Sequence, residues 1–442
     1  MRISERLDQL PLSRFHWWVV VSAGLGWMFD AMDSGIVSFV LPVLAKEWGL
    51  APQQVGRIGS MGLAGMFAGA VLVGALSDRF GRRLLFQSTL ALFSVATGLC
   101  GITTGYLSLL AMRFLVGMGL GGELPVASTL VSEFSPREHR GKLVVVLESF
   151  WAFGWALAAV LSYLLIPHWG WRAGFFVGCL PVLYVLWLRR AVPESPRYLE
   201  AIGRFAEATR VVRSVEAACG QRAEPIEAAA SIEPAASPGL GAIWRGGLVR
   251  RTIMLWLLWF AMVYSYYGIF IWLPSLMVAR GLGLVKSFEY VLVITAAQIP
   301  GYFSAAWFVD RAGRKPTLTV YLLGCAGAAV GFGLAQSAGA VVTLGCLMSF
   351  FNLGAWGVVY TYTPESYPTA LRGTGSGWAA GVGRLGGIIA PLVVGHILAL
   401  APGRQDVVFI HFAAVIVVGL LSVVILGEET KGRSLESLEA EL

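Results

Sequence analysis

Long apolar runs, separated by short polar segments, set the pattern of this sequence. Three of the runs, Leu84–Met112, Thr252–Ala279 and Pro316–Pro364, contain no Asp, Glu, Lys or Arg. A membrane-spanning helix needs roughly 20 apolar residues, so the first two runs can each hold one span and the third can hold two. Along the whole chain the pattern predicts twelve spanning helices. Their predicted limits are 17–45, 56–77, 84–104, 107–131, 143–167, 171–190, 251–279, 288–309, 317–336, 339–363, 374–400 and 405–427.

Composition supports a membrane protein and argues against an enzyme. Hydrophobic residues make up 57% of the chain and charged residues only 13%, whereas ordinary soluble domains carry about 25% charged residues. The apolar excess must therefore face lipid. The sequence has no Gly-x-x-x-x-Gly-Lys-Ser/Thr loop for a nucleotide and no His/Cys cluster with metal-ligand spacing. We therefore expect neither ATP-driven pumping nor a metal or other cofactor.

The net charge is +7, and the distribution of Lys and Arg among the loops predicts how the chain is oriented in the membrane. Lys and Arg gather in the two tails and in 78–83, 132–142, 191–250, 310–316 and 364–373. Because loops rich in Lys and Arg stay on the cytoplasmic side, we expect both termini in the cytoplasm and the chain in the cell inner (plasma) membrane. The basic balance then needs no nucleic-acid partner. The first apolar run, Trp17–Leu44, is too long for a cleavable signal and is interpreted as the first span.

An internal repeat divides the chain into two related halves. Asp78-Arg79 followed by Gly81-Arg82 recurs as Asp310-Arg311 followed by Gly313-Arg314, 232 positions later. The same offset relates Leu41-Pro42 to Leu273-Pro274, Glu133 to Glu365, and Arg140-Gly141 to Arg372-Gly373. An even number of spans per half gives both halves one orientation, as in transporters built from parallel repeats. We predict a six-helix bundle at 1–190, a solvated linker with short surface helices at 191–250, and a second six-helix bundle with a tail at 251–442.

Several motifs resemble those of known transporters. Gly74-Ala-Leu-Ser-Asp-Arg-Phe-Gly-Arg-Arg83 resembles the loop signature of the major facilitator superfamily. Pro193-Glu-Ser-Pro-Arg197 and Glu429-Thr-Lys-Gly-Arg433 resemble marks of its sugar-porter and metabolite–proton symporter branches. Gly26-Trp-Met-Phe-Asp-Ala-Met-Asp-Ser-Gly35 resembles the bacterial niacin permeases. The resemblance implies the all-α major-facilitator fold, twelve transmembrane helices in two pseudo-symmetric bundles, and secondary transport of a small organic acid.

The charged loops between spans are candidates for a gate. Acids there can accept from helix N-termini, and arginines can bridge helix ends and bind acids of neighbouring loops. The resemblance implies a cytoplasmic latch between the halves, while the simpler alternative is that these charges anchor the loops at the lipid headgroups. The predicted gating residues are Asp78, Arg79, Arg82, Glu133, Arg140, Asp310, Arg311, Arg314, Glu365 and Arg372.

Ionisable residues inside the apolar runs are candidates for proton coupling, because burying one costs at least ~2.5–3.5 kcal/mol on insertion scales. Asp30 and Asp33 share one face of the first span, and Glu123 lies in a glycine-rich segment of the fourth that resembles the symporter motif. We predict that these three acids carry the proton. Glu123 could instead pair with loop arginines, and Asp33 with Arg113 at a similar depth. Glu148, one turn into the fifth span, is expected to belong to the loop network.

Arg384 is the predicted contact for a substrate carboxylate. It lies roughly 15 Å into the eleventh span among glycines that permit close approach. A central arginine needs an anion, which is either the substrate or, alternatively, Asp30 or Asp33. The resemblance adds that an eleventh-helix arginine is a feature of organic-anion carriers. The other predicted substrate residues are Arg113, Tyr264, Tyr267, Gln298 and Asn352, although aromatic residues on a membrane helix also serve packing.

We therefore expect proton-coupled uptake of a small organic anion, nicotinate before others, by a monomer in the bilayer. Another aromatic acid or a sugar stays open as the substrate. The alternative from another class is a transporter-like receptor that binds its ligand without translocating it. Acids retained inside the membrane argue against a receptor, because a receptor needs no proton cycle.

Overall fold

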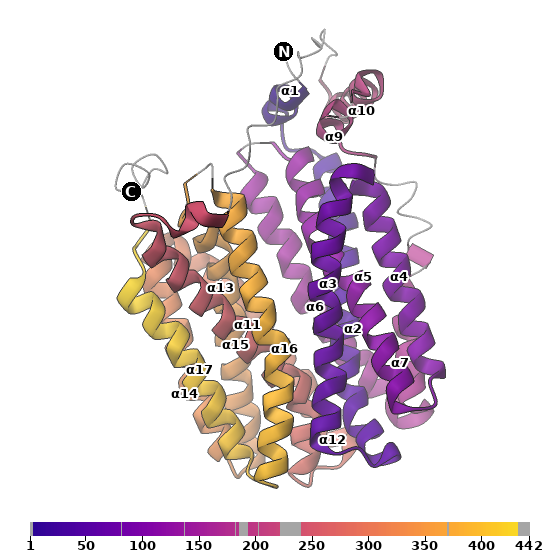
Figure 1. Ribbon diagram of the computed structural model, residues 1–442, viewed down its shortest axis with the longest axis vertical. Helices are drawn as coiled ribbons and strands as arrows, with labels where there is room; N and C mark the ends of the chain where they lie inside the picture. The colour runs from indigo at the N-terminus through magenta and orange to yellow at the C-terminus, as the bar shows by residue number, and fades with distance from the viewer. Residues whose placement is uncertain are drawn as a thin grey trace. The chain divides into compact units, whose positions relative to one another are not determined.

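Every regular element in the described part of the chain is a helix. The computed structural model describes residues 3–80, 82–136, 138–181, 183–184, 193–201, 203–221, 240–368 and 371–431 (Figure 1). In the first half the long helices are α2 (Arg14–Trp48), α3 (Pro52–Phe80), α4 (Arg82–Ile102), α5 (Tyr106–Phe134) and α6 (Arg140–Trp169), followed by the shorter α7 (Trp171–Gly178). Four of these five long helices cover a predicted span and extend it by a few residues, whereas α4 begins two residues before the predicted span 84–104 and ends two residues before its end.

The second half repeats this order. Its helices are α11 (Leu248–Ala279), α12 (Leu284–Ala296), α13 (Gln298–Ala312), α14 (Arg314–Leu334), α15 (Ala338–Glu365), α16 (Arg372–Leu400) and α17 (Gln405–Leu426). Within the described residues, nine helical stretches are long and apolar enough to cross a membrane, and α12 with α13 counts as one of them. The all-helical prediction is confirmed.

The predicted eighth span is two helices rather than one. α12 ends at Ala296 and α13 begins at Gln298. Pro300 explains the interruption, because it has no N–H to donate to the carbonyl of Ala296 four residues earlier. The end of the sixth predicted span, 185–190, lies outside the described residues.

Short helices flank the bundles. The polar N-terminal segment forms α1 (Ile3–Gln9), and the linker contains α9 (Pro196–Ala201), α10 (Phe205–Ala218) and a 3₁₀ turn at Leu240–Trp244. α1 packs on α9 and α10, where the Arg6 side chain forms a buried ion pair with Glu216. The sequence predicted surface helices in the linker, but the polar pattern of 1–14 did not predict α1.

Contacts divide the chain into two compact units. The first comprises Met1–Ser34, Ala64–Ala158 and Arg172–Glu233, and the second comprises Gly35–Leu63, Ala159–Trp171 and Pro234–Leu442. Within the second unit α11 packs along α16 and α17, and α15 packs along α13 and α14; Figure 1 shows α14 and α17 running side by side. The predicted bundles at 1–190 and 251–442 stay a prediction.

The internal repeat is preserved in the packing of the helices. A Cβ added to Gly69 of α3 would lie 2.1 Å from the carbonyl oxygen of Met118 on α5. The equivalent glycine, Gly301, would meet the equivalent carbonyl, that of Phe350, at 2.2 Å. Both pairs of equivalent residues are 232 positions apart in sequence. Only glycine permits this approach, so each half uses it at the same place.

A second packing contact is also duplicated. A Cβ at Gly154 of α6 would lie 2.3 Å from the carbonyl oxygen of Met28 on α2. Gly386 of α16 and Phe260 of α11, again 232 positions later, give 2.7 Å. These contacts bring α6 against α2, which carries Asp30 and Asp33, and α16, which carries Arg384, against α11, which carries Tyr264 and Tyr267.

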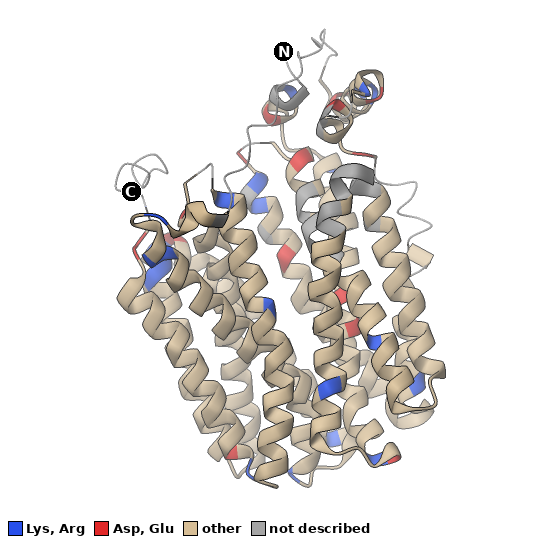
Figure 2. Ribbon diagram, in the orientation of Figure 1, with Lys and Arg blue, Asp and Glu red and all other residues tan. Residues whose placement is uncertain are grey.

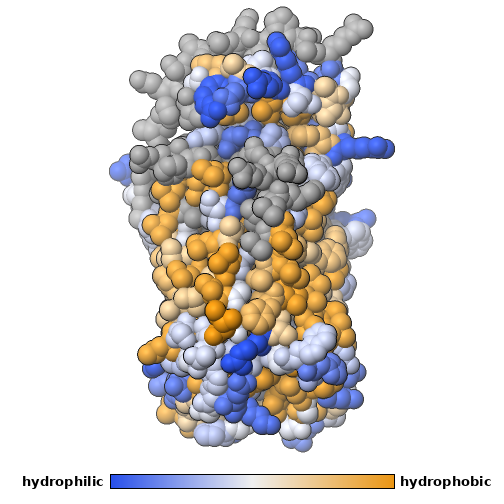
Figure 3. Space-filling model, turned by 90° about the vertical axis from the view of Figure 1, so that its right-hand side faces the viewer, coloured by the Kyte–Doolittle hydropathy of each residue, from blue (hydrophilic) through white to orange (hydrophobic). Residues whose placement is uncertain are grey.

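Large apolar side chains cover the outside of the helices. On α4 the exposed ones include Leu92, Val95, Leu99 and Ile102. Figure 2 shows Lys, Arg, Asp and Glu mostly near helix ends, and Figure 3 shows a broad hydrophobic field on one face, with hydrophilic residues above and below it. An apolar surface of this extent is stable against lipid and not against water.

Candidate functional site

The first unit contains a fully buried ion pair. Arg113 of α5 donates from Nη1 to Oδ2 of Asp33 on α2 at 2.9 Å, and Thr97 of α4 donates from Oγ1 to Oδ1 of the same carboxylate at 2.7 Å. Asp33 is 0% exposed and Arg113 4%. The pairing considered from the sequence is therefore present. It joins three helices and satisfies both oxygens of Asp33, as a charge in an apolar interior requires.

The other two acids predicted to couple protons are Asp30 and Glu123, and the structure describes the side chain of Asp30 only. Asp30 lies one helical turn before Asp33 on α2 and is also fully buried. Glu123 belongs to α5, and its side chain lies outside the described residues. α2 therefore carries two buried acidic residues, Asp30 and Asp33, and the structure gives the hydrogen-bond partners of Asp33.

Arg384 of α16 occupies a different setting in the second unit. It is partly exposed and forms neither a hydrogen bond nor an ion pair with a described residue, and its electrostatic neighbours are the phenols of Tyr267 and Tyr360. Gly383 and Gly387 bring α16 close to α11: a Cβ at Gly387 would lie 3.3 Å from the Tyr267 ring. The backbone thus holds a cation beside aromatic rings without giving it an anion among the described residues. A planar organic anion matches that arrangement.

The remaining predicted substrate residues are more buried. Tyr264 shares a 2.7 Å hydrogen bond between its hydroxyl and Nε2 of His411, which ties α11 to α17. Asn352 of α15 donates to Oγ of Ser265 at 3.3 Å, and Gln298 accepts from the Tyr266 hydroxyl at 3.4 Å. Oδ1 of Asn352 and Nε2 of Gln298 have no hydrogen-bond partner among the described residues. Tyr264 thus serves packing, while both amides keep capacity for a further contact.

Sequence reasoning missed an aromatic group on α15. The Trp356 ring lies 5.5 Å from the Tyr360 ring and 6.3 Å from the Tyr266 ring, and Trp259 packs against both Trp356 and Tyr360. Trp356 is buried, and its indole Nε1 has no acceptor among the described residues. The spacing of Trp356 and Tyr360 at i, i+4 was the available signal, the same spacing that singled out the aromatic residues of the seventh span.

Predicted gating residues of the second half form a network with the C-terminal tail. Arg314 donates from Nε and Nη2 to the two oxygens of Glu365 at 2.9 and 2.7 Å, and Thr430 donates to the same carboxylate at 2.6 Å. Glu429 accepts from the backbone N–H groups of Arg314 and Lys315, both at 3.0 Å, at the N-terminus of α14. Gly313, at φ +98, leaves room for that carboxylate.

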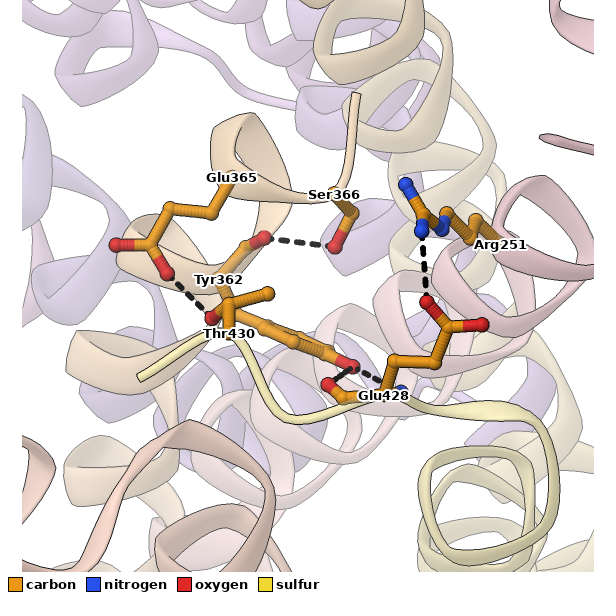
Figure 4. Close-up of a pocket in the computed structure, with 6 residues that line it drawn as sticks. All are labelled: Arg251, Tyr362, Glu365, Ser366, Glu428 and Thr430. Atoms are coloured by element: carbon orange, nitrogen blue, oxygen red, sulfur yellow. Dashed lines mark hydrogen bonds and ion pairs between the residues drawn. The ribbon is translucent and has the colours of Figure 1, made fainter. Parts of the chain in front are cut away.

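The same tail lines a small pocket (Figure 4). Arg251 of α11 pairs with Glu428 at 2.7 Å, and the Tyr362 hydroxyl donates to the backbone carbonyl of Glu428 at 2.6 Å. Figure 4 shows these residues with Glu365, Ser366 and Thr430 around one cavity. The tail residues 427–431 thus connect α11, α14 and α15 through charged and backbone contacts.

Other predicted gating residues follow the repeat. Arg140 donates from Nε to the carbonyl of Ser132 at 3.0 Å, and Arg372 donates in the same way to the carbonyl of Pro364, also at 3.0 Å. Arg140 additionally forms an ion pair at 2.6 Å with Asp8 of α1. The Arg311 guanidinium lies 3.7 Å from the Trp307 ring centroid, and Asp310 is exposed.

Three predicted gating residues have undescribed side chains. Asp78, Arg79 and Arg82 lie in α3 and α4, and the positions of their side chains fall outside the described residues. Glu133 is partly exposed near the end of α5. The gating role of all these residues stays a prediction.

Two sequence halves with duplicated helix packing are typical of secondary transporters built from parallel repeats. The family described as "Sugar (and other) transporter" matches residues 29–442. The chain therefore belongs to this family of major-facilitator transporters, and it is not an enzyme.

Named relatives narrow the group. The chain is 48% identical to the niacin transporter of Acinetobacter baylyi, over 99% of this chain and 100% of that protein. It is 47% identical to a putative niacin/nicotinamide transporter of Bacillus subtilis, over 94% and 96%. A benzoate transport protein of Acinetobacter baylyi is 30% identical over 96% and 91%.

A solved structure agrees with the fold. The inward-open xylose transporter of E. coli superposes with a TM-score of 0.76, covering 96% of this chain and 99% of that chain at 20% sequence identity. At that identity the likeness shows the fold alone, which is the predicted twelve-helix major-facilitator fold.

Proposed function

We propose that this protein takes up nicotinate by proton-coupled alternating access. The observation that carries the proposal is Arg384, a cation beside Tyr267 and Tyr360 with no acid among its described neighbours. Nicotinate supplies one carboxylate and one flat ring, which match a guanidinium and aromatic side chains. Two relatives at 47% and 48% identity carry niacin in their names, which supports the same substrate here.

Recognition of the carboxylate predicts discrimination against the amide. A guanidinium can bind a carboxylate through two parallel charge-assisted hydrogen bonds, whereas the neutral carboxamide offers one acceptor and no charge. Nicotinamide should therefore bind this chain weakly, and Gln298, Asn352 and Trp356 are the proposed polar and aromatic contacts for the ring. Arg113 differs from the other predicted substrate residues because its guanidinium is already bound to the Asp33 carboxylate.

Proton coupling is proposed to act through the acids of α2, with Glu123 of α5 as a further member. Protonation of Asp33 would remove the charge that neutralises Arg113 and so weaken the bond between α2 and α5. Breaking a buried pair in this way is worth about 3–5 kcal/mol, enough to shift a conformational equilibrium. Asp30, one turn away and buried, can take part in the same event.

The remaining parts of the proposal concern topology and gating. We place the chain in the cell inner membrane as a monomer, with both termini in the cytoplasm, because the Lys- and Arg-rich loops share one side. The two sequence halves, 1–190 and 251–442, act as the moving bundles and 191–250 as the linker. The loop charges around Glu365 and Arg140 form the cytoplasmic latch.

Transport by purified protein in liposomes tests the proposal. With an inward proton gradient, labelled nicotinate should accumulate, a protonophore should abolish the accumulation, and nicotinamide and sugars should compete poorly. The benzoate transport protein among the relatives favours one second candidate, uptake of benzoate-like acids. Preferred accumulation of benzoate over nicotinate would establish that candidate, and specific binding without any counterflow would support a receptor instead.

A further inference from the structure

Glu148 of α6 is a buried carboxyl group without a partner among the described residues. Its side chain is 7% exposed, and it forms no hydrogen bond or ion pair with any of them. The loop network expected from the sequence does not reach it there. Asp33, also buried, has a guanidinium and a hydroxyl on its two oxygens. The same unit therefore holds one acid that is fully neutralised and one that is not.

The surroundings of Glu148 are apolar and aromatic. α6 lies against α2, since a Cβ at Gly24 would meet the Phe150 ring at 2.7 Å. One turn beyond Glu148, Trp151 packs on Trp27 of α2 with 4.6 Å between ring centroids. The indole Nε1 of Trp27 is buried and has no acceptor among the described residues. Neither helix thus offers Glu148 a cation at this level.

Ionisable groups of the neighbouring elements do not compensate for it. These groups are Arg14, His16, Asp30, Asp33, Lys46 and Glu47 on α2; Tyr106, Arg113, Glu123 and Glu133 on α5; Arg140, Lys142, Tyr163 and His168 on α6 itself; Arg172 on α7 and Tyr184 after it. Arg113 is bound to Asp33, Arg140 to Asp8, and Tyr184 donates to the carbonyl of Ser22. Lys142 is exposed, about 9 Å along the helix from Glu148. Within the described part of the chain, no electrostatic partner therefore acts on the Glu148 carboxyl.

A carboxylate in such a place has a large desolvation cost that nothing offsets, whereas the neutral acid does not. We propose that Glu148 carries a second transported proton, separate from the proton of the α2 acids, which it binds in this conformation and releases when α6 becomes hydrated. The inference rests on the proposed proton-coupled uptake and deepens it. The step is simple acid–base chemistry: one proton binds one carboxylate, and water accepts it on release.

The consequence is a change in the charge moved per cycle. One proton with one nicotinate anion carries no net charge, so the membrane potential cannot drive it. Two protons carry one net positive charge, for which a potential of 100 mV sustains an accumulation ratio of roughly 50-fold. Glu148 should thus make uptake sensitive to potential.

The test uses full-length protein in liposomes and compares Glu148→Gln with wild type. Glu138→Gln, at an exposed loop position, is the matched control, and Glu148→Asp keeps the carboxyl group. Three readouts are taken for labelled nicotinate: counterflow without gradients, uptake driven by a pH gradient at zero potential, and uptake driven by an inside-negative potential at equal pH. We expect Glu148→Gln to keep counterflow and pH-driven uptake and to lose the roughly 50-fold potential-driven accumulation. Glu138→Gln and Glu148→Asp should retain all three transport activities.

Other outcomes overturn the inference. Potential-driven accumulation that survives in Glu148→Gln removes Glu148 from coupling, and loss of counterflow in a folded variant makes it a binding or structural residue. If Glu148→Gln does not fold, the proton-to-nicotinate ratio of the wild type decides, because a ratio of one instead of two contradicts the second proton. Failure of the proposed function is distinct: wild-type protein would then accumulate nicotinate under neither gradient.

Discussion

The two halves share their packing and differ in their buried charges. Gly154 on Met28 and Gly386 on Phe260 are the same contact 232 positions apart. At the same offset, Asp33 becomes Ser265 and Arg113 becomes Gly345, so the ion pair has no counterpart in the second half. Conversely, Arg384 corresponds to Ala152. The first unit therefore contains a buried charge pair that neutralises itself, and the second contains a cation whose described neighbours include no acid.

The two kinds of charge suit different tasks. The Asp33–Arg113 pair can stabilise the structure or take up a proton, whereas the Arg384 guanidinium can bind a ligand. A paired carboxylate changes state by gaining a proton, since its guanidinium partner keeps its charge over all relevant pH. An arginine whose described electrostatic neighbours are two phenols changes state by gaining an anion. Under the proposed function, the contrast assigns proton coupling to the first half and substrate binding to the second.

The largest expected effect comes from removing the carboxylate of the pair. Asp33→Asn leaves the Arg113 guanidinium buried beside a neutral amide, which should destabilise the protein by about 3–5 kcal/mol. The melting temperature in detergent should fall, and proton-driven accumulation of nicotinate should be lost. Thermal unfolding followed by intrinsic fluorescence, with transport on the same preparation, measures both.

A double variant provides the control for that change. Asp33→Asn with Arg113→Gln removes both charges, so it should recover much of the stability while still lacking coupled accumulation. A single Asp33→Asn variant as stable as wild type would show that the pair is not a unit, and the contrast between the halves would lose its basis.

Next in size is the loss of the arginine in the second half. Arg384→Ala should weaken nicotinate binding roughly 10- to 100-fold, because a charge-assisted contact contributes about 1.5–3 kcal/mol. Stability should change little, since Arg384 forms no hydrogen bond or ion pair with a described residue. Binding is measured by titration of purified protein with labelled nicotinate.

Arg384→Lys is the matched variant. Its nicotinate affinity should lie between that of the wild type and that of Arg384→Ala, because lysine keeps the charge and loses the bidentate geometry. Two results would contradict the assignment: unchanged nicotinate affinity in Arg384→Ala, or a fall in stability as large as that of Asp33→Asn. The second result would mean that Arg384 has a structural partner after all.

A smaller effect is expected at the N-terminus of α14, where backbone N–H groups donate hydrogen bonds to the Glu429 carboxylate. Glu429→Ala removes the acceptor for the N–H groups of Arg314 and Lys315, a loss comparable to that of an N-cap, about 0.5–2 kcal/mol. The melting temperature should drop modestly and turnover should change more than affinity. Asp310→Asn, at an exposed position, serves as the comparison and should leave the melting temperature unchanged.

The sequence predicted the spans closely because a membrane imposes length and apolarity on each helix. It located Asp33, Arg113 and Arg384 because charges inside apolar runs are conspicuous. It offered the pairing of Asp33 with Arg113 only as an alternative, since pairing depends on helix rotation, and it gave no signal for Thr97, an ordinary residue in an apolar run that binds the same carboxylate. The repeat carries a further signal for the packing, because Gly69 and Gly301 occupy equivalent positions in the two halves.

Other features of the structure were not predicted from the sequence. α1 was missed because its helix is held by a distant contact, Arg6 with Glu216, and not by its own periodicity. The break at Ala297 follows from Pro300, yet many membrane helices tolerate a proline without interruption. Trp356 differs from these two, because its i, i+4 spacing with Tyr360 was a signal that the sequence analysis did not use.

The smallest expected effect tests the position that replaces Asp33 in the second half. Ser265→Ala removes the acceptor of the 3.3 Å hydrogen bond from Asn352, leaving that amide with Sγ of Cys325 at 3.6 Å. A neutral hydrogen bond contributes about 0.5–1.5 kcal/mol, so the melting temperature should fall slightly and far less than for Asp33→Asn. If the Asn352 amide contacts the pyridine ring, freeing it should alter nicotinate affinity a few-fold while benzoate affinity stays constant, because only the pyridine offers a ring nitrogen. Parallel titrations with both acids measure this, with Ser422→Ala, a buried serine of α17 outside the group, as the control. Equal shifts for the two acids would show that Ser265 and Asn352 only position the helices, and the second half would then bind its ligand through Arg384 and the aromatic rings alone.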